Sequence, residues 1–505
     1  MSKKKVLFCS EASWLSTGYS VYTKEVLSRL KDVETIEVAE LACYAAVEDL
    51  DGRDIPWKVY PNKPSPNDPA LDSYNGNPSA QFGEQAFNQV LLHYQPDIVI
   101  DIRDWWMMEY QQRSPFRDFF HWAIMPTVDA TPQADQWINT YASADAVFAY
   151  SEFGRDTLLS QCEDIKFVDI ASPSASNAFM PYEDKGSHKA SMGLSSDVFI
   201  VGTVMRNQKR KLYPDLFESF RKFLNEVQDP NVYLLCHTYY PDVGWDIPKL
   251  VGINNSINEN ELASVYNLFD VYVQYANSEG FGMPQLEAAQ CSLPVVSTYY
   301  SAMKSIVDNI NAIGIEPLSY YLECETGCKR AVPDNSKFIE ELVKLYHGRA
   351  QLPELGAEMR NNALDHYNWD KTADTWLNHI IKVRPKDPQE TWLSPPKILK
   401  PDTTIPNNLG SMVEKVNHLF YNTLHKPEWI GGYLWRKVLK DCTFGYRCEN
   451  LQKDFYFNES HMQSQQGNQA FSIDDAIKEL VFFRGQTNEW EKARYEKVSS
   501  KGRGQ

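Results

Sequence analysis

The sequence predicts an α/β protein that consists of two doubly wound halves and a C-terminal extension. Two patterns predict this class: short apolar strands alternate with amphipathic helices, and the alternation begins again after a polar stretch at residues 177–197. Alternation of this kind is typical of parallel sheets with helices on both faces. The length of 505 residues is enough for two or three domains.

The first half opens with a strand–loop–helix unit. Residues 4–9 (KKVLFC) read as a buried strand, and the apolar positions of residues 21–31 (VYTKEVLSRLK) have helical spacing. Further short apolar strands are expected at 96–102, 121–128, 146–151 and 166–172.

The second half repeats this order. Strands are expected at 197–205, 231–238, 270–276 and 293–299, and helices at 214–227, 258–269 and 335–348. Two such halves enclose a crevice at the carboxyl ends of their strands, and ligands bind there.

These patterns divide the chain into four segments. We expect one Rossmann-like domain at 1–182 and a second at 183–370, with hinges near 177–197 and near residue 370. Residues 371–385 are expected to form a helix that crosses back to the first domain. Residues 386–505 are expected to form an extension that is irregular, then helical.

Composition limits the kinds of partner. The net charge of −17 argues against nucleic-acid binding by the protein as a whole. Residues 371–505, however, hold 20 Lys and Arg against 16 Asp and Glu, so this segment alone is basic enough to contact a polyanion. No apolar run is long enough to span a membrane, and the N-terminus does not resemble a signal peptide. Nine cysteines without regular spacing indicate reduced thiols and a cytoplasmic protein. The pairs Cys324/Cys328 and Cys442/Cys448 are interpreted as loop thiols rather than metal ligands.

One stretch carries distinctive chemistry: NSEGFGMPQLEAAQ, residues 277–290. A helix is expected to begin after its Gly-Phe-Gly-Met-Pro turn, and the amino end of a helix attracts anions. The two carboxylates, Glu279 and Glu287, would repel a phosphate but can accept hydrogen bonds from hydroxyl groups. The stretch therefore suits a ligand with both phosphate and hydroxyl groups. The alternative is a capped helix end.

Residues 277–290, with Glu279 and Glu287 eight positions apart, resemble the E-x7-E signature of retaining nucleotide-sugar glycosyltransferases of family 4, the glycogen-synthase-like group. Other stretches resemble this family in the same order: STGYSVYTKEVLSRL, YSEFGRDTLL, GTVMRNQKRK and LASVYNLFDVYV. The likeness covers about residues 4–385. It implies the GT-B fold, in which two Rossmann-like domains face each other, the first holding the acceptor and the second the nucleotide-sugar donor.

The resemblance also implies roles for individual residues. Arg206 and Lys211 would hold the donor diphosphate and stabilise it as it leaves, although RNQKRK is also a plausible solvated basic run. Glu279 would accept hydrogen bonds from the sugar hydroxyls, and Glu287 from the ribose. The other donor-binding residues are glycines and backbone N–H donors: Gly18, Gly280, Phe281, Gly282 and Met283.

One departure from the family concerns the first domain. Many relatives have a histidine after a first-domain strand, whereas this strand ends in Asp129, which we expect near the reaction centre. His121 begins the strand and is interpreted as structural. The stretch DIRDWWMMEY is predicted to line the acceptor side of the cleft and is called the candidate acceptor wall. Its lining residues would be Asp101, Arg103, Asp104, Trp105 and Trp106.

The resemblance therefore implies a retaining transferase in which the leaving phosphate oxygen takes the acceptor proton. The resemblance implies a nucleotide sugar as co-substrate and no obligatory cofactor or metal. The identity of the acceptor stays open between a glycan, a small molecule and a hydroxymethylated base of bacteriophage DNA. If the protein is viral, we expect it in the host cytoplasm. A non-catalytic GT-B-like binding protein, and a phosphorylase or an epimerase on this fold, are further alternatives. The oligomeric state also stays open.

Overall fold

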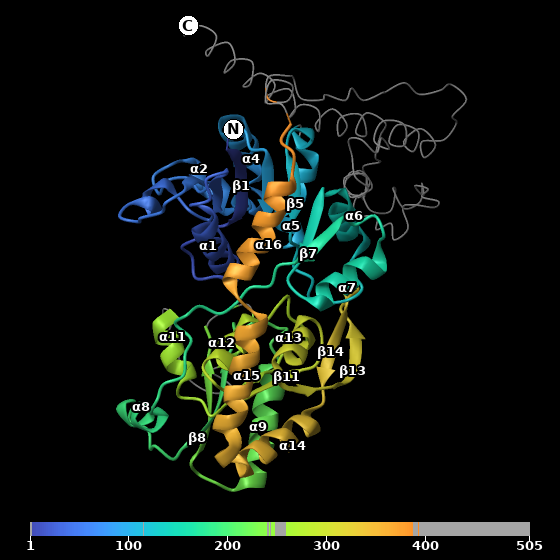
Figure 1. The fold of residues 1–505 in the computed structure, drawn as a ribbon. Coiled ribbons are helices and arrows are strands. Elements are labelled where there is room, and N and C mark those ends of the chain that lie inside the picture. The colour runs from blue at the N-terminus through green and yellow to red at the C-terminus, as the bar shows by residue number, and fades with distance from the viewer. Residues whose placement is uncertain are drawn as a thin grey trace, which may run out of the picture.

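The computed structural model describes residues 3–114, 116–239, 242, 244–247, 259–386 and 392, which form two stacked α/β bodies (Figure 1). The helices expected at 473–483 and 488–498, most of the proline-rich segment, and Cys442 and Cys448 lie outside these residues.

The first body contains a seven-stranded parallel sheet with the strand order β3-β2-β1-β4-β5-β6-β7. Its strands are β1 (Lys4–Glu11), β2 (Ile36–Cys43), β3 (Lys58–Pro61), β4 (Ile98–Asp101), β5 (His121–Ile124), β6 (Ala146–Ala149) and β7 (Phe167–Ile170). All six pairings are parallel.

The second body contains a five-stranded parallel sheet with the order β12-β11-β10-β8-β9. Its strands are β8 (Phe199–Val204), β9 (Val232–His237), β10 (Val271–Gln274), β11 (Val295–Thr298) and β12 (Ile313–Ile315). In both sheets the order reverses around a central strand, as expected for doubly wound folds. The predicted class, two Rossmann-like halves, is confirmed.

Helices cover both sheets (Figure 1). Those of the first body are α1 (Gly18–Leu30), α2 (Ala70–Asn75), α3 (Pro78–Gln81), α4 (Glu84–Tyr94), α5 (Trp105–Met108), α6 (Asp135–Ser143) and α7 (Glu152–Gln161). Those that follow are α8 (Lys185–Ser191), α9 (Tyr213–Val227), α11 (Glu259–Tyr266), α12 (Met283–Gln290), α13 (Ala302–Ile310), α14 (Asn335–His347), α15 (Leu352–His366) and α16 (Trp369–Lys382).

Helix α16 returns to the first body and packs against α1 (Figure 1). The Trp376 indole N–H donates to the Tyr22 hydroxyl at 2.8 Å, and its ring lies 4.1 Å from that of Phe148. The Lys4 ammonium donates to the Ile380 carbonyl at 3.0 Å. The end of the described chain is thus held on the first body by aromatic packing and buried hydrogen bonds.

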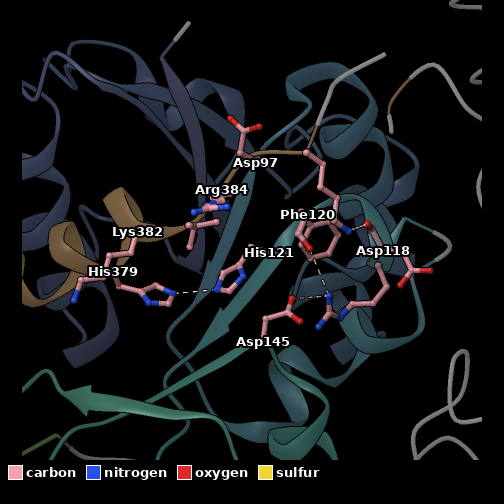
Figure 2. Close-up of a pocket in the computed structure, with 11 residues that line it drawn as sticks. Asp97, Asp118, Phe120, His121, Asp145, His379, Lys382 and Arg384 are labelled. Carbon is pink, nitrogen blue, oxygen red and sulfur yellow. Dashed lines mark hydrogen bonds and ion pairs between the residues drawn. The ribbon is translucent and has the colours of Figure 1, made fainter. Parts of the chain in front are cut away.

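A pocket of about 460 Å3 lies at the amino ends of β4 to β6 (Figure 2). His121, the first residue of β5, meets His379 of α16 there with 3.0 Å between their Nε2 atoms. Burial, followed by the charge of the neighbouring histidine, lowers the pKa of His379 to about 4. This pocket lies at the opposite edge of the sheet from the carboxyl ends, and His121 contributes to the docking of α16.

A two-stranded antiparallel hairpin, β13 (Pro317–Leu322) and β14 (Lys329–Pro333), was not expected from the sequence. It extends from the second body to the first, because the Lys329 N–H donates to the Thr131 carbonyl at 2.9 Å and the Cys328 thiol to the Pro132 carbonyl at 2.9 Å. The hairpin therefore joins the two bodies beside their facing edges.

The polar stretch 177–197 contains the short helix α8. Its residue Lys189 is buried and forms an ion pair with Asp270, just before β10, at 2.6 Å. The cysteines of the described residues are all free thiols. No helix among those residues has the length and apolar character that a membrane span requires.

Asp101 and Arg103 form a wholly buried ion pair at the end of β4. Arg103 Nε donates to Asp101 at 2.8 Å and its Nη1 to the Phe82 carbonyl at 2.8 Å, and Gln111 also donates to Asp101 at 2.6 Å. The sequence placed both residues on the acceptor wall. In the structure neither side chain is exposed, so their charges hold the interior of the first body together.

Replacement of Asp101 by alanine should lower the free energy of unfolding by about 3–5 kcal/mol, because it leaves the Arg103 charge buried without its partner. Glu218→Ala is the matched control, since Glu218 pairs with Arg221 on the solvent side of α9, and its loss should lower the free energy by at most about 1 kcal/mol. Denaturant unfolding measures both. Equal, small losses would contradict an essential role for the buried pair.

Candidate active site

Loops from both sheets meet at the carboxyl ends of the strands. In the second body, the loop after β8 carries Arg206, Arg210 and Lys211, and the loop after β10 leads through residues 277–282 into α12. In the first body, the loops after β1, β4 and β5 face them. A Cβ on Gly280 would lie 2.2 Å from Thr127 Cγ2, so only glycine permits this approach of the two bodies.

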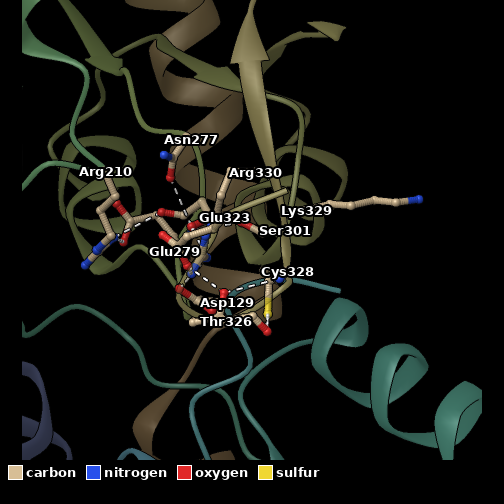
Figure 3. A network of polar contacts seen from close by, with 12 residues as sticks. Asp129, Arg210, Asn277, Glu279, Ser301, Glu323, Thr326, Cys328, Lys329 and Arg330 are labelled. Atoms are coloured by element: carbon tan, nitrogen blue, oxygen red, sulfur yellow. Dashed lines mark hydrogen bonds and ion pairs between the residues drawn. The ribbon is translucent and has the colours of Figure 1, made fainter. Parts of the chain in front are cut away.

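Glu279 lies at the centre of the polar network in Figure 3. Its side chain is 6% exposed, and it accepts hydrogen bonds from Arg210 at 2.5 Å and from Gln274 at 2.7 Å. The Lys211 ammonium forms an ion pair with the same carboxylate. The Glu279 N–H donates to Ser301 Oγ at 2.9 Å, which fixes the loop to the start of α13.

The cations of the basic run after β8 differ from one another in burial and in their partners. Lys211 is buried, and burial and then the charge of Arg210 lower its pKa, while its ammonium lies in an ion pair with Glu279. Arg206 is 65% exposed and makes a two-point ion pair with Asp242, at 2.8 and 3.2 Å. Arg210, which the sequence did not single out, takes the place beside Glu279.

Asp129 lies in the same network and contacts Arg330, a residue that could not be identified from the sequence. Arg330 of β14 donates to Asp129 at 2.7 Å, to Ser278 Oγ at 2.7 Å and to Glu323 at 2.7 Å (Figure 3). Arg330 is buried and joins the first body to the loop that carries Glu279. Its sequence neighbourhood, CKRAVP, contains no motif that would have identified it.

Asp104 begins α5 and lies on the first-body side of the cleft. Burial raises its pKa to about 6, the charge of Asp129 adds to this, and hydrogen bonds from Tyr19 and Thr127 oppose it. Tyr19 and Thr127 are themselves hydrogen-bonded, with 2.7 Å between their hydroxyl oxygens. Asp104 therefore gains or loses its proton within the physiological range.

The start of α12 has the conformation that the sequence predicts. Gly282 caps the helix with a φ of 106°, which favours glycine, and Pro284 occupies the first turn. Phe281 is 7% exposed and packs against Tyr150 and Tyr367, so its ring belongs to the core. Glu287, one turn into the helix, accepts a hydrogen bond from the Tyr266 hydroxyl at 2.7 Å.

Gly18 is the first residue of α1, and a Cβ there would meet no atom within 4 Å. Trp105 packs its ring on Trp137 at 6.0 Å and donates to Thr140 Oγ1 at 3.1 Å, while Trp106 is 50% exposed. Of the candidate acceptor wall, Asp104 thus lies in the polar network, and Asp101 and Arg103 do not. Within the described residues, no group of three or more His, Cys, Asp or Glu could hold a metal ion.

Three comparisons bear on the identity of this site. Residues 247–317, which include Glu279 and Glu287, match the family described as Glycosyl transferases group 1. The sucrose-phosphate synthase from Thermosynechococcus elongatus has a similar structure with a TM-score of 0.60 at 16% identity, over 75% of this chain and 99% of that one. The chain has the GT-B fold. The predicted resemblance is confirmed at this level.

Further proteins are similar to this chain in structure or in sequence. Anabaena HepE in complex with UDP and glucose has a TM-score of 0.56 at 13% identity, over 75% of this chain and 99% of that one. Among curated sequences, the chain is 24% identical to the serotype-specific mannosyltransferase WbdA of Escherichia coli over 210 residues, 39% of this chain and 22% of that protein. It is 23% identical to the D-inositol 3-phosphate glycosyltransferase of Rhodococcus erythropolis over 229 residues, 43% of this chain and 48% of that protein. The chain thus spans less than half of either relative.

Asp104 should titrate with a midpoint of about 6, neutral below and ionised above, in 13C NMR of aspartate-labelled protein with Asp104→Asn as the assignment variant. Tyr19→Phe should raise the midpoint, because it removes a hydrogen bond that stabilises the carboxylate. Asp184, the exposed cap of α8, is the control: its hydrogen bonds from Ser187 lower its pKa below the ordinary value. Equal midpoints for Asp104 and Asp184 would contradict this description of the site.

Proposed function

We propose that this GT-B protein is a retaining glycosyltransferase of family 4 that moves a sugar from a nucleotide-sugar donor to a hydroxyl acceptor in the cleft between the two bodies. The observation that carries the proposal is the convergence of Arg210 and Lys211 on Glu279, immediately before the helix α12. The family match over residues 247–317, which include Glu279 and α12, and the similar structure that contains UDP and glucose support it. The first domain, residues 1–182, faces the acceptor, and the second domain, residues 183–370, holds the donor.

The charges of the cluster suit a leaving diphosphate. Arg210 and Lys211 place two cations beside the amino end of α12, where backbone dipoles also favour an anion. Arg206, exposed on the same loop, can exchange Asp242 for a phosphate. Such preorganised positive charge stabilises the negative charge that develops as the sugar–phosphate bond breaks.

The remaining donor contacts follow from the same loops. Glu279 positions the cations and offers its carboxylate to sugar hydroxyls, and Gly280, Gly282 and Met283 contribute backbone to the donor. Glu287 accepts hydrogen bonds from the ribose hydroxyls. Gly18 lies where nothing in the fold itself requires glycine, which supports its role in admitting the donor close to the first loop.

On the acceptor side, Asp104 and Asp129 are the polar groups of the first body nearest the cluster. In the proposed step the acceptor oxygen forms its bond to the anomeric carbon on the face from which the diphosphate leaves. The acceptor proton passes to the departing phosphate oxygen. Asp104, ionised above about pH 6, accepts a hydrogen bond from a second hydroxyl of the acceptor and so orients it, which leaves the reacting hydroxyl free to direct its own proton to the departing phosphate oxygen. Arg330 fixes Asp129 beside it.

Lys211→Ala and Arg210→Ala should each reduce release of nucleoside diphosphate from the preferred nucleotide sugar by about 10²–10³-fold, because each removes a charge aimed at the leaving group. Lys209→Ala is the matched control: it belongs to the same basic run, but its ammonium lies over the Trp245 ring at 5.0 Å. Its rate should stay within about twofold of the wild type. No release and no binding with any of a panel of nucleotide sugars would refute the proposal.

The anomeric configuration of the product tests the retaining class separately. The protein is incubated with the donor and three kinds of acceptor: oligosaccharides, small polyols and hydroxymethylated duplex DNA. The product should keep the donor configuration when its anomeric proton is followed by NMR, and an inverted product would exclude the retaining mechanism. Transfer to DNA alone would favour the base-modifying alternative, whose basic tail lies outside the described residues.

A further inference from the structure

A second pocket, of about 520 Å3, lies between α7 of the first body and α13 of the second, two helices that are neighbours in Figure 1. The Phe153 N–H donates to Ser305 Oγ at 3.1 Å across this junction, and Asn309 donates to Glu152 at 3.5 Å. The volume falls within the usual range for ligand pockets, roughly 300–1,000 Å3.

The lining of this pocket combines hydrogen-bonding groups with apolar atoms, and its carboxylates outnumber its one cation. It contains the carboxylates of Glu152, Asp156 and Asp308, four hydroxyl groups, one amide and the ammonium of Lys304. Lys304 is already engaged, because it donates to the Tyr299 hydroxyl at 3.1 Å and lies 3.8 Å from Asp308. The lining thus offers acceptors to hydroxyl groups, and it would repel an anionic ligand such as DNA.

An aromatic ladder runs from the rim of the pocket to the molecular surface. The Phe153 ring lies 5.8 Å from that of Tyr300, which lies 5.2 Å from that of Tyr320 on the hairpin. Tyr320 is 50% exposed, and Leu318 and Leu322 on the same face of β13 are 70% and 64% exposed. Apolar ring faces beside hydroxyl acceptors match the two faces of a sugar ring, one apolar and one polar.

Two segments that line the pocket, the loop at Thr131 and helix α13, begin at the candidate active site. Thr131 follows Asp129 by two residues, and Ser301, which accepts from the Glu279 N–H, directly precedes α13. The pocket residues on α13 are three to eight positions after Ser301, about 5–12 Å along the helix at 1.5 Å per residue. One extended ligand can therefore occupy this pocket and still reach the cleft.

We propose that the pocket between α7 and α13, together with the Tyr320 surface, binds an uncharged, hydroxyl-rich glycan chain. Its placement as the part of the acceptor beyond the reacting sugar rests on the proposed function. The binding site itself does not, because the pocket and the ladder lie outside the Glu279 cluster. Affinity for a glycan across the junction also favours the arrangement in which the two bodies face each other.

Binding of two neutral probes, maltoheptaose and an α-mannoheptaose, to the full chain is measured by isothermal titration calorimetry. At least one probe should bind, and Tyr320→Ala and Ser160→Trp should each weaken it by about tenfold, the first by removing the ring and the second by filling the pocket.

Each variant has a matched control. Ser191→Trp is paired with Ser160→Trp, since both serines are exposed on a helix and donate to the carbonyl three residues earlier. Tyr233→Ala, 47% exposed on β9, is paired with Tyr320→Ala. Both controls should bind as the wild type does.

Nucleoside diphosphate release in the same preparations separates this inference from the proposed function. Donor turnover without binding of either probe, or with equal binding by wild type and both variants, overturns the glycan site alone. Probe binding that the variants weaken, without any donor turnover or donor binding, supports the site and overturns the transferase. Competition between duplex DNA and the probes, abolished by Ser160→Trp, would overturn the choice of an uncharged ligand.

Discussion

The candidate site depends on one buried carboxylate. Glu279 is almost excluded from water, and a buried charge is tolerated only when it is paired and hydrogen-bonded. That requirement brings Arg210 and Lys211 from the loop after β8, Gln274 from β10 and, through the backbone N–H, Ser301 from the start of α13. Three loops of the second sheet are thereby united around one charge. Arg210 and Lys211 both pair with the single carboxylate of Glu279, so two cations are held beside the amino end of α12.

The contact between the two bodies adds a second constraint. Gly280 approaches Thr127 so closely that any side chain would collide, and Arg330 holds Asp129 from the opposite side. The hairpin β13–β14 extends this contact to the loop at Thr131. The polar groups of the two bodies are therefore fixed relative to each other by direct contacts, and a shift of either body changes both sides of the site.

Much of this architecture could be predicted from the sequence, because buried strands and amphipathic helices leave periodic patterns. β2 and β3 were missed: IEVAELAC and KVYP alternate less clearly, and their conformation depends on the pairing of β2 with β1 and of β3 with β2. The glycine turn before α12 could be predicted because its conformation is local. Arg210 could not be chosen over Arg206, since all the cations of RNQKRK share one irregular loop. Arg330 could not be predicted as a site residue, because it comes from a hairpin about fifty residues after Glu279, and only the tertiary fold brings it to Asp129.

Asp104 and Asp129 show how one site gives similar groups different tasks. Asp129 lies in an ion pair with Arg330, so its carboxylate is committed to a partner from the other body. Asp104 receives hydrogen bonds from Tyr19 and Thr127, and its surroundings raise its pKa to about 6, burial first and the charge of Asp129 as well. The two carboxyl groups therefore have different partners: Arg330 for Asp129, and the hydroxyls of Tyr19 and Thr127 for Asp104. The hairpin thus contacts Asp129 through Arg330, and the charge of Asp129 in turn contributes to the raised pKa of Asp104.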